Sequence, residues 1–575
     1  MPARSPASES ASATSRIVHG SEAGSARPSL RVAVLLSGPA PEAWVVDLIE
    51  RLAGHPHLAL HLGMIAAVGG GDSIAVTGPS TDRRARALLR SSLVDRPRFD
   101  PHARRPTPLP ASLDAVPVVR VEALEPHTVD VLLDVGARDP AFERRLAPGT
   151  PLWSARVATL EQRVERALLD RASLFQLCLW RRDATRPTDP WRRFAAHALP
   201  RQSYSITDLS GAAFRALPAV LVSRLNWQAA GHDPQAVETA SLASDDTEAR
   251  DARLDAAEGE GRSGELRAAL RLVARQSVSR VRGRFHDEVW QLAATGQRSP
   301  TDTAVAPSAP GLLAQVESTP LDDWRAIEPP TDRIWADPHL CRRDGETHLF
   351  FEELMHGEPH AHVCTARIDD HGALIETPRL ALKEPFHLSY PCVFEHAGEH
   401  WMLPETAARR AVSLYRATRF PDRWELALDI LTDVDLADST LHRHDGRWWL
   451  FTNRFTHRVV DERDELLIYF ADALEGPWTP HALNPVVTGV DRARMAGPLF
   501  EDGGHRYRPN QYGAVRYGHG INLARIDELT PALYRETPVH RLLPGPASRW
   551  LGCHSLASAG GLGVIDRVGR RRRAG

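Results

Sequence analysis

Apolar residues in this chain follow two different spacings, one before and one after about residue 290. Between residues 29 and 230, the runs RVAVLL, LALHLGMIAAV and VDVLLDV are almost continuously apolar, and helical spacing over residues 41–54 follows the first of them. Buried strands joined by a helix are typical of a βαβ unit with a parallel sheet. We therefore expect an open α/β domain over residues 29–230, with a further helix at Ala155–Leu169 and a further strand at Leu174–Trp180.

Past residue 330 the apolar residues alternate with polar ones, and the pattern repeats. The short aromatic segments HLFFEE, HWMLPET and RWWLFTN each follow an Asp-Gly or Ala-Gly turn. Equivalent positions in four copies, and in a weaker fifth copy (WLGCHSLASAGGLGVID), are 53, 48, 58 and 58 residues apart; they are Asp337, Tyr390, Asp438, Ala496 and His554. A repeated β-meander with a period of about 50 residues predicts a β-propeller, whereas a β-sandwich needs no internal repeat.

These patterns divide the chain into five parts. Residues 1–28 have the composition of a disordered arm, and residues 231–287 form an acidic linker with a connecting helix. The predicted propeller covers residues 288–566, and residues 567–575 are left as a basic tail. The expected fold is therefore multidomain, with an N-terminal α/β (Rossmann-like) domain and a C-terminal, all-β, five-bladed propeller.

Composition narrows the classes of function. A formal net charge of −3 gives no general electrostatic reason to expect a nucleic acid partner. The first residues lack an apolar leader, the five cysteines show no CxxC spacing, and apolar runs such as Ala59–Val68 are too short to span a bilayer. We expect a cytoplasmic protein without a transmembrane segment. The basic run Arg570–Arg573 is interpreted as a solvated tail, with peripheral contact to an anionic membrane as the alternative.

Polar residues recur where each blade begins, and in a propeller these positions face the central channel. Asp337, Tyr390, Asp438 and His554 would form a ring there. Two carboxylates facing each other across a funnel suit glycosyl chemistry, and Trp335 could support a sugar ring. A single Asp before a strand is normally a turn cap, but two at equivalent blade positions favour a functional site.

The motifs WADPHL and ADSTLHRHDGRWWLFTN resemble the first and third blades of family-43-type glycoside hydrolases. That resemblance implies that Asp337 is the base and that Asp438 modulates the acid. Taken as a set with HLSYPCVFEHAGEHWMLPETA, ARMAGPLFEDGGHRYRPNQ and YGHGINL, the motifs are more similar to the N-terminal propeller domain of glucosamine inositolphosphorylceramide transferases. They are also similar to bacterial proteins that couple this propeller to a formyltransferase-like domain.

One position departs from the hydrolase pattern. The hydrolases carry their general acid in a motif like E-G-P-x-L-Y, and this chain has Ala496 in place of that Glu. Without a proton donor, hydrolysis of an unactivated glycoside loses roughly a hundredfold to ten-thousandfold in rate, whereas a sugar–nucleotide donor needs no such proton. The sequence therefore predicts glycosyl transfer to an acceptor in glycan, glycolipid or natural-product assembly. The alternatives are a hydrolase with a relocated acid (Glu405, Glu352 or Glu353), a non-catalytic sugar-binding scaffold, and a residual amino-sugar N-formyltransferase.

Other polar residues end or follow the aromatic strands and are candidate sugar ligands. They are Glu405, Asn453, Arg508 and Gln511, and Arg508 would also suit a phosphate. Hydrogen bonding between blades is the alternative role for each. No histidine spacing resembles a zinc motif, so no metal ligand is assigned. In family-43 propellers a late-blade histidine can hold a central cation, which leaves room for a divalent cation near His554, beside a sugar–nucleotide donor.

The opening residues 31–69 resemble the first strand, helix and second strand of formyltransferase-fold proteins. Those enzymes need an Asn-His-Asp set, and the corresponding stretch here, PLWSARVATLEQRVER, has no His, Gly or Asp. No GxGxxG or GxxxxGK[ST] phosphate loop occurs in the chain. We therefore expect a degenerate α/β scaffold with a packing or acceptor-binding role.

Overall fold

The fold is taken from a computed structural model, which describes residues 29–65, 83–91, 104–169, 174–200, 205–233, 265–274, 286–295, 311–455 and 463–572. The predicted arm at residues 1–28 lies outside the described residues, as does most of the acidic linker. Within the linker region, residues 265–274 form a helix that packs on the core of the N-terminal domain.

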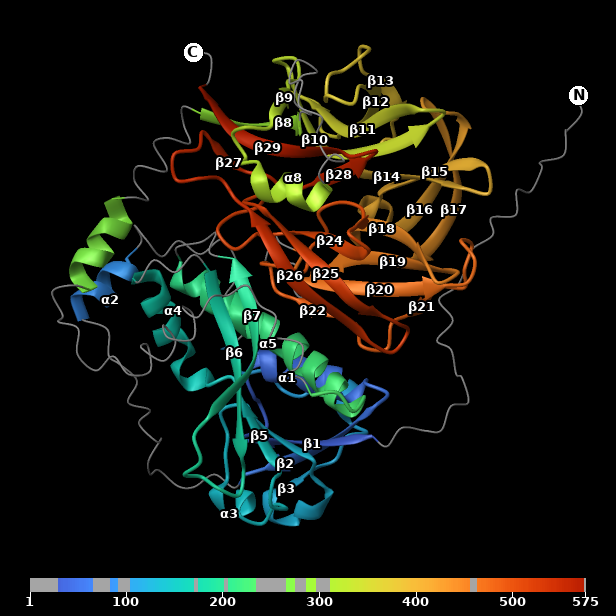
Figure 1. The fold of residues 1–575 in the computed structure, drawn as a ribbon. Coiled ribbons are helices and arrows are strands. Elements are labelled where there is room, and N and C mark those ends of the chain that lie inside the picture. The colour runs from blue at the N-terminus through green and yellow to red at the C-terminus, as the bar shows by residue number, and fades with distance from the viewer. Residues whose placement is uncertain are drawn as a thin grey trace, which may run out of the picture.

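The N-terminal domain is built on one seven-stranded sheet of order β3-β2-β1-β4-β5-β6-β7 (Figure 1). Its strands are β1 Leu30–Leu36, β2 Leu58–Met64, β3 Val118–Arg120, β4 Val131–Asp134, β5 Pro151–Ser154, β6 Leu174–Asp183 and β7 Arg192–Pro200. Its helices are α1 Ala43–Ala53, α2 Arg83–Leu89, α3 Pro140–Glu143, α4 Leu160–Leu169 and α5 Ile206–Ala229. The predicted α/β class is confirmed, but the sheet is mixed because β6 pairs with β5 and β7 in antiparallel fashion.

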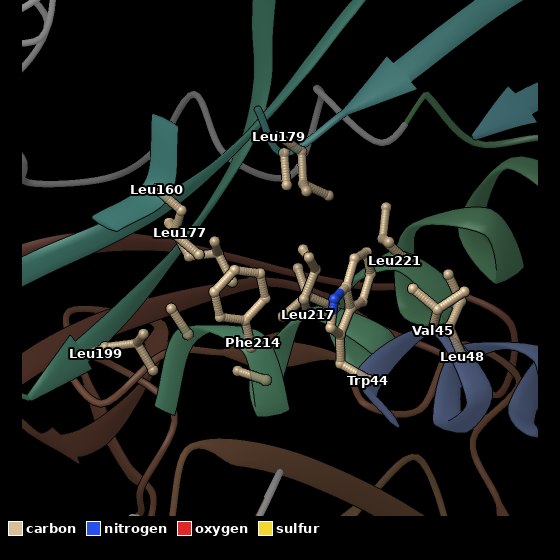
Figure 2. Close-up of a cluster of buried hydrophobic side chains, with 14 of the residues drawn as sticks. Trp44, Val45, Leu48, Leu160, Leu177, Leu179, Leu199, Phe214, Leu217 and Leu221 are labelled. Atoms are coloured by element: carbon tan, nitrogen blue, oxygen red, sulfur yellow. The ribbon is translucent and has the colours of Figure 1, made fainter. Parts of the chain in front are cut away.

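Helices α1 and α5 bury one face of this sheet. Trp44 of α1 lies against Phe214 of α5, with ring centroids 5.9 Å apart, and leucines of β6 and β7 close the cluster (Figure 2). Helix α5 is covered by the sheet on one side and by the propeller on the other, where Trp227 packs. Nearly all of its sides are therefore buried, which is consistent with its apolar sequence. Among the described residues it is the one helix long and apolar enough to cross a membrane, and 83% of that stretch is buried inside the protein.

The C-terminal region consists of five antiparallel sheets, each one blade, so the predicted five-bladed propeller is confirmed (Figure 1). Blade 1 contains β10 Arg333–Arg343, β11 Glu346–Met355, β12 His362–Ile368 and β13 Arg379–Leu382. Blade 2 contains β14 Ser389–His396, β15 Glu399–Glu405, β16 Ala411–Arg419 and β17 Arg423–Thr432. Blade 3 contains β18 Ala437–His444, β19 Arg447–Arg454, β20 Glu465–Ala471, β21 Thr479–Pro480 and β22 Val487–Thr488. Blade 4 contains β23 Phe500–Asp502, β24 His505–Gln511, β25 Ile521–Leu529 and β26 Tyr534–Leu542.

Blade 5 combines strands that precede the other four blades in the sequence with strands that follow them. It contains β8 His286–Ala294, β9 Arg325–Ile327, β27 Trp550–Gly552, β28 Leu556–Ala559 and β29 Leu562–Arg572, and helix α8 (Leu312–Ser318) packs beside it. Strand β8 pairs with β29 from His286↔Arg572 to Ala294↔Val564, which closes the ring. The predicted boundary at residue 566 is therefore wrong, because residues 567–572 continue β29. Arg567 is buried there and donates to the carbonyl oxygens of Leu321 and Trp324.

Candidate active site in the propeller channel

A β-bulge lies in the first strand of each of the first three blades. The strand register shifts between Ala336 and His339 in blade 1, and equivalent shifts occur in blades 2 and 3. The first bulged residues are Asp337, Tyr390 and Asp438, whose φ angles are 48°, 48° and 50°. A left-handed conformation costs energy for a residue with a Cβ and clusters at functional sites. Three of the five repeat positions found in the sequence therefore share one strained geometry.

Asp337 is the centre of a buried polar network. Its Oδ1 accepts a hydrogen bond from the Ser555 hydroxyl at 2.6 Å, and its Oδ2 accepts the Tyr390 backbone N–H at 3.2 Å. Asp566 accepts the backbone N–H of Asp337 at 3.0 Å. The side chain of His554 lies between the two carboxylates, with Nε2 3.3 Å from Asp337 and Nδ1 2.7 Å from Asp566.

This enclosure shifts the pKa values of both partners. Burial raises the pKa of Asp337 to about 7, although the neighbouring His554 lowers it. Burial lowers the pKa of His554, but the charges of Asp566 and Asp337 outweigh that effect and raise it to about 9. A carboxyl group that titrates near neutrality is suited to take a proton in general base catalysis.

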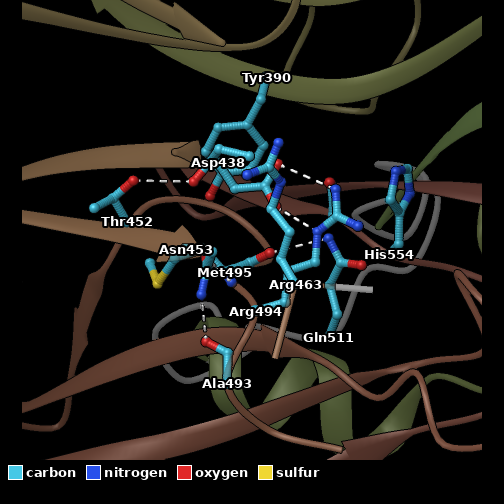
Figure 3. Close-up of polar contacts among 12 residues, drawn as sticks. Tyr390, Asp438, Thr452, Asn453, Arg463, Ala493, Arg494, Met495, Gln511 and His554 are labelled. Carbon is cyan, nitrogen blue, oxygen red and sulfur yellow. Dashed lines mark hydrogen bonds and ion pairs between the residues drawn. The ribbon is translucent and has the colours of Figure 1, made fainter. Parts of the chain in front are cut away.

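Asp438 is held by a guanidinium. Arg494 Nε lies 2.5 Å from Asp438 Oδ2, and the Arg494 guanidinium also lies over the Tyr517 ring, 5.0 Å from its centroid (Figure 3). The Tyr517 ring is 5.1 Å from that of His554. Tyr517 thus connects the Asp337 and Asp438 halves of the channel. Its pKa is raised well above 10, chiefly by burial, and the Asp337 and Asp438 charges raise it further.

Glu352 and Glu405 form a second set of channel carboxyls. Each lies on the second strand of its blade, opposite the residue that precedes the bulge. His387 Nε2 pairs with Glu352 at 3.3 Å, which raises the pKa of His387. Burial and the charge of Asp438 raise the pKa of Glu405 to about 7. The opposing cations near Glu405 are Arg463, Arg494 and His387.

The raised pKa of Glu405 predicts a stability cost that grows with pH. The folded protein favours the neutral carboxyl, so stability falls as pH rises from about 4.5 through 7. Glu405→Gln should therefore stabilise the fold by about 1–3 kcal/mol more at pH 8 than at pH 4.5. Urea unfolding at the two pH values measures this difference. An exposed carboxyl, Glu399 on the same strand, provides the matched control Glu399→Gln, for which no pH-dependent gain is expected. An equal gain for both variants would contradict the raised pKa of Glu405.

Four of the predicted sugar ligands have internal partners instead. Trp335 donates to Glu353 at 2.8 Å inside blade 1, and Gln511 donates to the Met495 carbonyl at 3.0 Å. Asn453 is fully buried; its amide donates to the Glu465 and Ala493 carbonyls and accepts the Met495 N–H. Arg508, also fully buried, makes a bidentate ion pair with Glu536, with N···O distances of 2.7 and 2.6 Å. The structure brings Asp337, Asp438 and Glu405 close to one another and to His554. The Tyr390 hydroxyl, by contrast, bonds to Thr440 and to the Gly497 N–H, and the four residues above lie between strands and blades.

Ala496 occupies a closed position. It is fully buried, its N–H donates to the Pro509 carbonyl, and its carbonyl accepts the Leu556 N–H. The next residue, Gly497, donates its N–H to the Tyr390 hydroxyl at 2.7 Å. No acidic side chain therefore lies at the position that the hydrolase resemblance assigns to the general acid.

Sequence reasoning missed Asp566, Ser555, Arg494 and Tyr517. The sequence did hold a signal for Asp566. The fifth copy of the repeat ends at this residue, and the first three copies end at or next to the polar residues Glu353, Glu405 and Asn453. Arg494 and Tyr517 lie on connections of irregular length, where a repeat gives no register.

Two groups of side chains are close enough to hold a metal ion among the described residues: Asp337, His554 and Asp566, and Glu353, His362 and Cys364. The first matches the cation that the family-43 resemblance suggests, since carboxylates and imidazole are suitable ligands. Both ring nitrogens of His554 already face carboxylates, so a protonated His554 and a bound cation are alternative ways to neutralise the same two charges. In the second group, Arg333 lies 3.2 Å from Glu353 and competes with any cation.

Residues 327–549 match the family described as glucosamine inositolphosphorylceramide transferase 1, N-terminal. Two relatives that carry the name glucosamine inositolphosphorylceramide transferase 1 come from Oryza sativa subsp. japonica and Arabidopsis thaliana. The first is 36% identical over 40% of this chain and 32% of its own length, and the second is 35% identical over 36% and 27%. The chain thus spans about a third of the length of the curated relatives it matches.

Similar solved structures include an exo-1,5-alpha-L-arabinanase from a bovine ruminal metagenomic library and a family-43 beta-xylosidase/alpha-arabinofuranosidase from a compost metagenome. They are 15% and 14% identical, cover 43% and 41% of this chain and 95% and 90% of their own, and have TM-scores of 0.30 and 0.31. Similarity at this identity and TM-score does not establish the fold. The five-bladed architecture is shown by the strand pairing within the chain. The matched stretch 327–549 ends before His554 and Asp566, so part of the Asp337 network lies outside it.

Proposed function

We propose that the propeller channel transfers a glycosyl unit from an activated donor to an acceptor hydroxyl in glycan or glycolipid assembly. The observation that carries the proposal is Asp337, a buried carboxyl with a pKa of about 7 held by Ser555 and His554. Both relatives are named glucosamine inositolphosphorylceramide transferase 1, and this name supports a glycan or glycolipid substrate.

In this mechanism Asp337 takes the proton of the acceptor hydroxyl as that oxygen attacks the anomeric carbon. The new bond joins the acceptor oxygen to the anomeric carbon, and the bond from that carbon to the donor phosphate breaks. The phosphate leaves with the electron pair and needs no proton, which is consistent with Ala496 in place of an acid. Asp438, fixed by Arg494, orients the sugar by accepting hydrogen bonds from its hydroxyl groups.

Donor consumption tests the proposal directly. The full chain is incubated with a panel of UDP- and GDP-sugars, with and without inositol phospholipids or short glycans, and release of the nucleoside diphosphate is measured. Release that depends on an acceptor supports transfer. Tight sugar binding with no donor consumed would replace transfer with the scaffold alternative.

Glycoside hydrolysis with Glu405 as the acid is the second candidate, favoured by the pKa of about 7 for that carboxyl. If it operates, Glu405→Gln should lower hydrolysis of unactivated oligosaccharides by roughly a hundredfold to ten-thousandfold. The loss should be much smaller with p-nitrophenyl glycosides, whose leaving group needs little protonation. Equal losses on the two substrates would argue against Glu405 as a proton donor.

The remaining expectations stay predictions. Residual N-formylation of an amino sugar by residues 29–230 predicts folate binding, which titration calorimetry with a folate analogue would detect. The cytoplasmic location and a peripheral contact with anionic membranes also stay predictions.

A further inference from the structure

Arg494 is carried by the connection between blades 3 and 4, residues 488–495, which we call the arginine loop. Gly489 makes a sharp turn in this loop with φ +110°, and its carbonyl accepts the N–H of Ala493. The loop then runs to the channel, where Arg494 meets Asp438 (Figure 3). The position of this ion pair therefore depends on what holds the loop.

The propeller holds one side of the arginine loop through buried polar side chains. Asn453 donates to the Ala493 carbonyl at 3.0 Å, and Arg508 donates to the Arg492 carbonyl at 2.8 Å. Asn522 donates to the Asp491 carbonyl at 2.7 Å. The residues predicted as sugar ligands at positions 453 and 508 thus support the loop that carries Arg494.

The α/β domain holds the other side. The carbonyl of Ala198 in β7 accepts the Val490 N–H at 3.1 Å. The neighbouring His197 places Nε2 3.0 Å from Oδ2 of Asp464, and both side chains are almost completely buried. The backbone carbonyl of Asp464 in turn accepts the Gly489 N–H at 2.8 Å. Strand β7 therefore contacts the arginine loop directly at Val490 and indirectly through Asp464.

Helix α5 adds an apolar contact. Trp227, 1% exposed, belongs to one buried cluster with Val487, Ala493 and Met495 of the propeller, and the same cluster includes Tyr390 of the channel. Nearby, Asn226 donates to the Ala482 carbonyl at 3.1 Å. Two neighbouring elements of the α/β domain thus pack on the loop that positions Arg494.

We propose that the α/β domain acts as an intramolecular clamp, in which His197 and Trp227 are positioning residues that hold the arginine loop so that Arg494 stays on Asp438. This role needs no ligand in the α/β domain. Loosening the clamp would leave Asp464 without its His197 contact and would weaken the hold of the α/β domain on the loop, where the Ala198 carbonyl and Arg224 would still bond Val490 and Thr488.

Hydrogen exchange in the full chain tests the clamp without any assumption about the reaction. In His197→Ala and Trp227→Leu, amides of residues 488–495 should exchange at least roughly tenfold faster, since local opening costs less when packing is removed. His197→Gln, which retains a hydrogen-bond donor, should show a smaller change. His61→Ala in β2, at the far side of the domain from the propeller (Figure 1), is the matched control and should leave these amides unchanged. Unchanged exchange in His197→Ala and Trp227→Leu would overturn the proposal.

A second readout separates positioning from general stability, and it rests on the second candidate function, hydrolysis with Glu405 as the acid. Arg494 faces Glu405 together with Asp438, Arg463 and His387, and it lowers the Glu405 pKa. When the loop is loosened, the limb of the pH–rate profile that reports Glu405 should move to higher pH, as it should in Arg494→Ala. A lower melting temperature with an unmoved pH profile would overturn the positioning role. If no turnover is found for the native chain, the exchange experiment still decides the clamp.

Discussion

Asp337→Asn is expected to lower turnover by roughly a hundredfold to ten-thousandfold, the usual contribution of a general base, while sugar binding changes little. The amide has nearly the shape of the carboxylate: its single oxygen can still accept the Tyr390 N–H, and its NH2 can donate to the Ser555 hydroxyl oxygen. What is lost is the group that accepts a proton near neutral pH. Single-turnover kinetics and calorimetric titration with the donor separate the two effects.

A matched control is available in the same blade. Asp344 has a φ of 50° at the turn between β10 and β11, and its side chain is 86% exposed. Asp344→Asn makes the same chemical change away from the channel and should leave turnover unchanged. Normal turnover in Asp337→Asn would remove the base from the mechanism, and equal losses in binding and turnover would make Asp337 a sugar ligand.

Arg508→Met is expected to destabilise the protein by about 3–5 kcal/mol, because it leaves the carboxylate of Glu536 without its cation in the interior. The double variant Arg508→Met/Glu536→Gln should recover part of this loss, since it removes the stranded charge as well. Urea unfolding of the single and double variants measures both values. The matched control is Arg525→Met, which breaks a half-exposed pair with Asp527 and should cost at most about 1 kcal/mol.

The Arg508 result also decides between two roles. A structural role predicts lost stability with sugar affinity changed only as far as the arginine loop moves. Full stability combined with weak binding of a phosphate-bearing donor would instead restore Arg508 as the phosphate ligand that its residue type suggests.

The sequence repeat predicted the blades and the ring positions because both depend on local pattern. Alternation and Gly turns place each hairpin, and the bulge recurs at the same point of each copy, so Asp337, Tyr390 and Asp438 could be aligned before any coordinates. The same pattern could not separate Glu405 from Asn453, which occupy equivalent strand positions. Asn453 differs because the arginine loop brings the Ala493 carbonyl and Met495 N–H within reach, and loop paths leave no periodic signal.

Long-range pairing was the other limit. Strands β1, β2, β4 and β6 were predicted near their observed positions, whereas β3 and β7 were not predicted. Periodicity does not reveal direction, so the antiparallel pairing of β6 was not foreseen. The predicted propeller boundary at residue 288 included most of β8, but no strand of blade 5 was assigned there, since its partner β29 lies more than 260 residues away in sequence. Asp566 went unnoticed for the same reason, although it bonds the Asp337 backbone.

The pairing of β8 with β29 closes the ring of blades. The shortest segment of the chain that keeps the candidate site intact must therefore include both strands. Asp337 belongs to blade 1, whereas Asp566 belongs to the strand that only β8 can complete. A segment limited to the stretch shared with the relatives, 327–549, contains Asp337, Glu352 and Asp438 but lacks His554, Ser555 and Asp566, which also surround Asp337. In a relative that shares only that stretch, other residues would have to close the ring, and they would be free to give the same aspartate a different acidity.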